Sequence, residues 1–163
     1  MNNYKSLSLV FTMLFAAILV IAQPTGSKNY VLSTVIKQSG ILNEASISNL
    51  AIGYNTKAES IAYFDGLGRP LQTVITKGSA SQKDIVSPVE YDALGREIKK
   101  YLPYVDITST TFGSYKTDWT TRQPAFYNGQ LAGVSTDAMA FAQTVLEPSP
   151  LNRPLAQGAP GTV

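Results

Sequence analysis

The chain has 163 residues, of which 44% are hydrophobic and 15% are charged, and its formal net charge at pH 7 is +2. This length favours one domain, and the balance of apolar and charged residues excludes disorder throughout. The small net charge gives no argument for a nucleic-acid partner or for an anionic membrane surface. The sequence contains neither His nor Cys. Histidine-based catalytic triads, thiolate nucleophiles, disulfides and histidine metal sites are therefore excluded, and we expect no cofactor.

Residues 1–22 have the pattern of a secretory signal peptide. Lys5 supplies a positive start, residues 7–22 are a nearly continuous apolar run, and Ala22 is a small residue for cleavage before Gln23. The alternative is a retained membrane anchor, but the run is short for a spanning helix, which needs about 20 apolar residues. The sequence therefore predicts a secreted or cell-surface protein with no stable membrane span after cleavage.

The sequence of the next part of the chain predicts a linker, three strands and one short helix. Residues 23–28 are polar with Pro and Gly, which is typical of a linker. Residues 29–37 are rich in Val, Ile, Thr and Tyr, which favours a strand. The apolar spacing within residues 41–47 allows a short helix, and residues 50–54 and 58–64 are predicted strands.

A six-residue motif then occurs twice, as FDGLGR at residues 64–69 and as YDALGR at residues 91–96, an offset of 27 (91 − 64). Residues that favour extended chain precede and follow each copy. Two such runs joined by a few residues containing Gly indicate a β-hairpin. We therefore predict hairpins at residues 58–76 and 85–102.

Asp, Gly and Arg of the motif each have a role in a turn. An Asp carboxylate accepts hydrogen bonds from N–H groups a few residues further on, Gly takes the left-handed position where a Cβ would clash, and Arg leans back toward the Asp. Pro70 follows the first copy and lacks an N–H, which favours an edge strand. The predicted structural turn residues are Asp65, Gly68, Arg69, Asp92, Gly95 and Arg96.

One alternative is that the two aspartates and Glu90 perform acid/base chemistry, and another is a hydrolase that uses the carboxylates of Asp65 and Asp92. Repetition at a fixed spacing is typical of structural units, so it favours the turn interpretation. We therefore expect no catalytic residue and no enzymatic activity.

The remaining elements are less regular. Residues 105–112 predict a loop, and residues 118–128 a short helix with Asp118 as its cap and Pro124 bending or ending it. Residues 138–146 favour a final strand.

Residues 148–163 are a Pro/Gly-rich tail that contains Leu151-Asn152-Arg153, a degraded Leu-Gly-Arg turn. Asn tolerates the left-handed conformation next best after Gly. The tail is therefore expected to start a further hairpin, whose second strand needs residues beyond those present.

Trp119 is the only Trp of the chain, and Tyr115 and Tyr127 lie near it in the sequence. Flat rings stack on sugars, so these three residues are a candidate platform for a cell-surface glycan. The competing interpretation is core packing, which large aromatic residues dominate in small domains. The predicted fold is mainly β: an antiparallel meander of hairpins with one or two short helices, in one domain spanning residues 29–147.

The chain also resembles a known family. Tyr-Asp followed by Leu-Gly-Arg marks the YD repeat of RHS proteins, in which many hairpins wind into a hollow β-shell. The order of motifs over residues 29–161 resembles the N-terminal domain of unknown function that precedes these repeats in secreted Bacteroidota proteins. The further motifs that carry the resemblance are RPLQ at 69–72, KDIV at 83–86, YLPY at 101–104, EPSPLNR at 147–153 and QGAPG at 157–161.

The resemblance implies a module of a cell-surface or polymorphic-toxin-like protein, with no known catalytic residues. Downstream RHS/YD repeats are the implied partner. We expect the module to pack onto these repeats or to cap them, because a repeat stack needs an atypical end. A carbohydrate-binding module is the second hypothesis.

Overall fold

The computed structural model describes residues 22–41, 43–53, 55–129, 133–134 and 136–161. Over these residues the protein is mainly β, and every strand pair is antiparallel. The elements in chain order are β1 (Asn29–Ile36), α1 (Glu44–Ser48), β2 (Lys57–Phe64), β3 (Pro70–Thr76), β4 (Ile85–Pro88), β5 (Lys99–Tyr101), β6 (Tyr104–Val105), α2 (Trp119–Asn128), β7 (Phe141–Leu146) and β8 (Pro154–Gly158). The predicted fold class, a mainly β antiparallel meander with two short helices, is confirmed.

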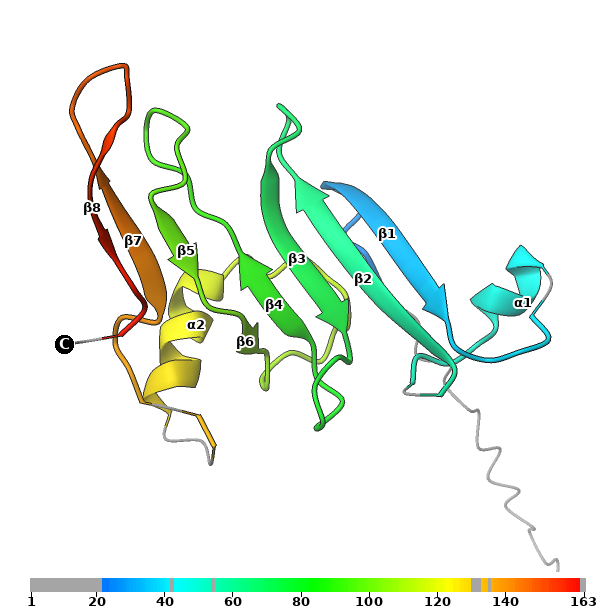
Figure 1. Ribbon diagram of the computed structural model, residues 1–163. Helices are drawn as coiled ribbons and strands as arrows, with labels where there is room; N and C mark the ends of the chain where they lie inside the picture. The colour runs from blue at the N-terminus through cyan, green and yellow to red at the C-terminus, as the bar shows by residue number, and fades with distance from the viewer. Residues whose placement is uncertain (1–21, 42, 54, 130–132, 135, 162–163) are drawn as a thin grey trace, which may run out of the picture.

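The strands form two sheets that lie side by side (Figure 1). The first has the order β1-β2-β3-β4-β6, and the second has the order β5-β7-β8. The first four strands follow the chain order, as expected of a meander. β3 is a central strand, so the prediction that Pro70 lies on an edge is wrong. A register shift beside Pro70 accommodates its missing N–H.

The hairpin predicted at residues 85–102 differs from expectation, because its two strands belong to different sheets. β4 pairs with β3 and β6, whereas β5 pairs with β7. Beyond the turn itself, the backbones of the two arms meet, within the described residues, at the isolated bridge between Glu90 and Lys99. Pro88 ends β4 and cannot donate to a partner strand. β7 instead pairs with β5, and Leu102 and Thr144 extend that pairing through backbone hydrogen bonds.

Two other segments also depart from the sequence prediction. Residues 50–53 form no strand, because β1 and β3 already occupy both sides of β2, and only Gly53 bridges to Lys57. Residues 23–28, predicted as a linker, are held against the sheet. The Gln23 N–H donates to the Phe112 carbonyl at 3.0 Å, and the Thr25 N–H donates to the Tyr63 hydroxyl oxygen at 3.1 Å.

The core lies on one face of the first sheet. Every second residue of β2 is buried, the pattern of a strand with one covered face. The covered face packs against α2 and the loop before it, and the buried apolar core residues are Ile61, Tyr63, Val74, Val86, Tyr104 and Trp119.

Helix α2 continues through Pro124 instead of ending there. The predicted side-chain cap by Asp118 is absent. The Asp118 carbonyl accepts from the Thr121 and Arg122 N–H groups, while its carboxylate lies 2.7 Å from the Arg122 guanidinium. The carboxylate therefore pairs with a cation one turn along and does not reach the helix N–H groups.

A buried ion cluster attaches the loop before α2 to the sheet. The Lys116 ammonium nitrogen lies 3.1 Å from the Asp84 carboxylate and 3.6 Å from that of Asp106, and all three side chains are at most 3% exposed. It also donates to the Thr111 carbonyl at 2.7 Å. Burial raises the pKa of Asp106, but hydrogen bonding to Arg122 and the charge of Lys116 outweigh it and hold that pKa below its usual value.

Candidate functional site

Turn 1 (residues 65–69) is a closed loop around the carboxylate of Asp65. One carboxylate oxygen accepts from the N–H groups of Leu67 and Arg69 at 2.8 and 2.9 Å, and the other accepts from Arg69 Nε at 2.7 Å. The Gly68 N–H donates to the Asp65 carbonyl at 3.1 Å, and the φ of Gly68 is 78°. Both carboxylate oxygens therefore serve the turn.

Turn 2 (residues 92–96) repeats this construction bond for bond. Asp92 accepts from the Leu94 and Arg96 N–H groups, both at 2.9 Å, and from Arg96 Nε at 2.8 Å. The Gly95 N–H donates to the Asp92 carbonyl at 2.9 Å, and the φ of Gly95 is 76°. The same motif therefore has the same geometry in turns 1 and 2.

Turn 3 (residues 147–153) is a longer version of the same turn. The Leu151 N–H donates to Ser149 Oγ at 3.2 Å, and Asn152, at φ 51°, donates to the Ser149 carbonyl. The acid is now Glu147, whose carboxylate accepts from Arg153 Nε at 3.0 Å. Ser149 thus takes the capping role of the aspartate and Glu147 takes its charge.

Turn 3 joins β7 to β8, so the hairpin predicted to be incomplete has its second strand within the described residues. The segment 148–163 is therefore not only a tail. Asn152 takes the left-handed position at which the other two turns have Gly.

The three turns lie at one end of the two sheets, and each contacts the next (Figure 1). The Arg69 guanidinium lies 4.7 Å from the ring centre of Tyr91, and the Tyr91 hydroxyl donates to the Pro70 carbonyl at 3.0 Å. Arg96 Nη1 donates to Asn152 Oδ1 at 2.7 Å. We call this arrangement, turns 1, 2 and 3 in that order, the three-turn array.

The electrostatics of the array suit ionised carboxylates. Hydrogen bonding from the backbone N–H of Arg69 lowers the pKa of Asp65, and Arg96 does the same for Asp92. A side-chain hydrogen bond from Arg153 lowers the pKa of Glu147. A general acid requires a raised pKa. The arrangement therefore gives no support to the carboxylate-hydrolase hypothesis.

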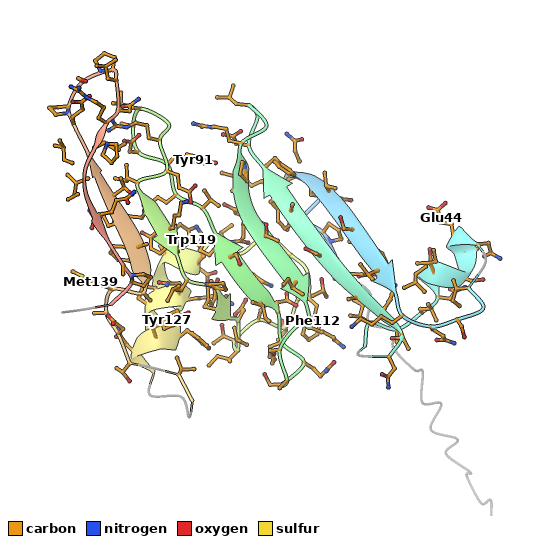
Figure 2. All side chains as sticks on the ribbon, viewed as in Figure 1. Glu44, Tyr91, Phe112, Trp119, Tyr127 and Met139 are labelled. Carbon is orange, nitrogen blue, oxygen red and sulfur yellow. The ribbon has the colours of Figure 1, made fainter. Side chains whose placement is uncertain are left out.

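The three residues of the candidate glycan platform lie in separate ring pairs. Tyr115 packs edge-on against Tyr63, and Trp119 packs edge-on against Tyr101. Tyr127 packs against Phe126 and donates its hydroxyl to the Pro103 carbonyl. Figure 2 shows Trp119 in the middle of the molecule and Tyr127 further from the turn end, where Tyr91 lies.

Trp119 is only 9% exposed and belongs to the core. A cavity of about 130 Å³ beside it is lined by neither Tyr115 nor Tyr127, but by Tyr101, Trp119, Thr120, Gln123, Pro124, Ala138 and Phe141. The three rings therefore do not share one open surface.

Sequence reasoning missed several residues of the array. The sequence motif gives Tyr91 no contact of its own, whereas in the structure its ring and hydroxyl join turn 2 to turn 1. Glu147 and Ser149 were not assigned a role. Turn 3 itself was expected from its Leu-Asn-Arg sequence, and the Arg-Pro-Leu shared by residues 69–71 and 153–155 is a further signal of its likeness to turn 1.

These features define a class of mainly β protein in which hairpin turns of one design are repeated side by side. Over residues 37–163 the chain matches the family model of a domain of unknown function (DUF6443), and it belongs to that family. Comparisons with curated proteins and with solved structures gave no match. Within the described residues, no helix has the length and apolar character needed to cross a membrane. The predicted signal peptide lies outside these residues, apart from Ala22.

Proposed function

We propose that this protein is a non-catalytic structural module, the N-terminal part or cap of an RHS/YD-repeat shell in a secreted or cell-surface protein of Bacteroidota. One observation carries this proposal: three turns of one construction stand in a row and contact one another. Repeat proteins stack units that bury their faces against their neighbours, and this array has that form. In a toxin-like protein, any enzymatic domain lies outside this sequence.

The use of the acids supports the same function. In turns 1 and 2 the carboxylate accepts three hydrogen bonds from its own turn, which leaves little capacity for a substrate or a metal ion. Arg69 contacts Tyr91, which leads into turn 2, and Arg96 contacts Asn152 in turn 3. The array therefore suits assembly with similar hairpins.

The gene itself tests this proposal. We expect the reading frame to continue past residue 163 into further motifs that begin with an aromatic residue and Asp and end in Gly-Arg. A glycan array with the full chain, as exported, tests the carbohydrate alternative, and we expect no specific retention. A reading frame that stops without such motifs, together with specific glycan binding by the folded chain, would contradict the proposal.

A further inference from the structure

The arginines of turns 1 and 2 each contact the part of the array that follows their own turn. Arg69 lies over the Tyr91 ring of the next unit, and a Cβ at Gly95 would lie 2.7 Å from Arg69 Nη1. Arg96 donates to Asn152 of turn 3. Arg153 holds the same position in turn 3, and its side chain is 70% exposed. The array is therefore open at the Arg153 end.

The strand after turn 3 copies the strand after turn 1. A register shift falls at the leucine of Arg-Pro-Leu in both places, with Phe64 opposite Pro70 and Leu146 opposite Pro154. In the first hairpin, this bulge receives the next unit. The Tyr91 hydroxyl donates to the Pro70 carbonyl at 3.0 Å, and the Val89 N–H donates to the Leu71 carbonyl at 2.8 Å.

The corresponding residues after turn 3 are Pro154 and Leu155 on β8. This strand pairs with β7 on one side, it is the last strand of its sheet, and all five of its residues are exposed. An exposed sheet edge is a template for pairing with another strand. The edge of β8 thus has the same features as the edge of β3 that pairs with the strand leading into turn 2. Unlike the edge of β3, it is exposed.

We propose that the β8 edge and turn 3 form a docking site for a further β-hairpin with an aromatic-Asp-x-Leu-Gly-Arg turn. Its first strand pairs antiparallel with β8, as β4 pairs with β3. Its aromatic residue lies under Arg153 and hydrogen-bonds to the Pro154 carbonyl, and the residue two positions before the aromatic donates to Leu155. This inference rests on the proposed function and specifies which edge receives the next repeat.

Among the other edge strands, the one that is mostly exposed, β1, lacks these features. β1 has the sequence NYVLSTVI, with neither Arg nor Pro, and so carries no Arg-Pro-Leu bulge. A second copy of this chain fits β8 less well. Two β8 strands related by a two-fold axis pair antiparallel and place their turns at opposite ends. Arg153 of one copy then has no turn beside it.

The test uses the full chain extended beyond Val163 by a long Gly/Ser linker and a second copy of residues 85–102. The linker raises the effective concentration of the hairpin to about the millimolar range without directing it to either edge. Hydrogen exchange measured by mass spectrometry then compares β8 (Pro154–Gly158) with β1 (Asn29–Ile36). We expect amide exchange in β8 to slow by about tenfold or more and exchange in β1 to be unchanged.

Two matched controls accompany this test. The same extension with its Asp and Gly both replaced by Ala cannot form the turn and should leave β8 unprotected. Arg153→Ala in the chain should reduce the protection, while the exchange of β2 and β3 shows that the fold is intact.

Protection of β1 in place of β8 would overturn this inference and leave the proposed function standing. Protection of neither edge would overturn the inference, while the gene's reading frame still decides the proposed function. Protection of β8 in the unextended chain that grows with concentration would assign the edge to a second copy and also overturn the inference.

Discussion

Lys116→Met is expected to destabilise the protein by about 3–5 kcal/mol, the largest effect of any single substitution considered for this fold. Removing one partner of a buried ion pair leaves the other charge without compensation. The Lys116 ammonium contacts Asp84 and Asp106 and also donates to two serine hydroxyls and the Thr111 carbonyl. Met has a similar length and no charge, so the loss reports the cluster rather than a cavity.

Urea denaturation followed by tryptophan fluorescence measures this loss, because Trp119 lies in the core. Lys100→Met is the matched control, since Lys100 is exposed on β5, and it should change stability by no more than about 0.5 kcal/mol. A loss below about 1 kcal/mol for Lys116→Met would show that the cluster does not hold the loop to the sheet.

Gly95→Val is the second large effect, at about 1.5–3 kcal/mol. The φ of Gly95 is 76°, a conformation that costs an L-residue with a Cβ about 1–2 kcal/mol. A Cβ there would also meet Arg69 Nη1 at 2.7 Å and displace the guanidinium from the Tyr91 ring. The loss of a cation–π contact adds about 0.5–1 kcal/mol.

Two variants separate these contributions. Gly68 has φ 78° with no atom within 4 Å of the added Cβ, so Gly68→Val should show only the backbone cost. Ala93 is exposed in turn 2, and Ala93→Val should be nearly neutral. Thermal unfolding ranks the three. Equal melting temperatures for Gly95→Val and Ala93→Val would count against the left-handed turn.

The turns could be predicted from the sequence because their chemistry is local. Asp, Gly and Arg within five residues determine both the backbone conformation and the hydrogen bonds of the turn. Two copies of the motif therefore form the same turn. Turn 3 was harder to recognise, because Glu147 supplies the acid two residues before the capping Ser149. Local motifs therefore predicted all three turns, but not the roles of Glu147 and Ser149 in the third.

Long-range pairing could not be predicted in the same way. Nothing in the sequence indicates that Lys116 pairs with Asp84, or that the strand after turn 2 joins β7 instead of β4. Both depend on which partner strand is free once the meander has formed. The contacts between turns belong to this group too, since Arg96 and Asn152 are far apart in the chain.

The central claim is that the aspartates of turns 1 and 2 stabilise the turn conformation and are not catalytic residues. An NMR titration of the Asp65 and Asp92 carboxyl carbons tests it most directly. We expect both pKa values to lie below the ordinary 3.8, because the turn N–H groups and the arginines favour the charged form. The stability that these carboxylates contribute should be complete above 3.8 and decline as the pH falls through the lower folded-state values. A pKa above 3.8 for either aspartate would contradict the account.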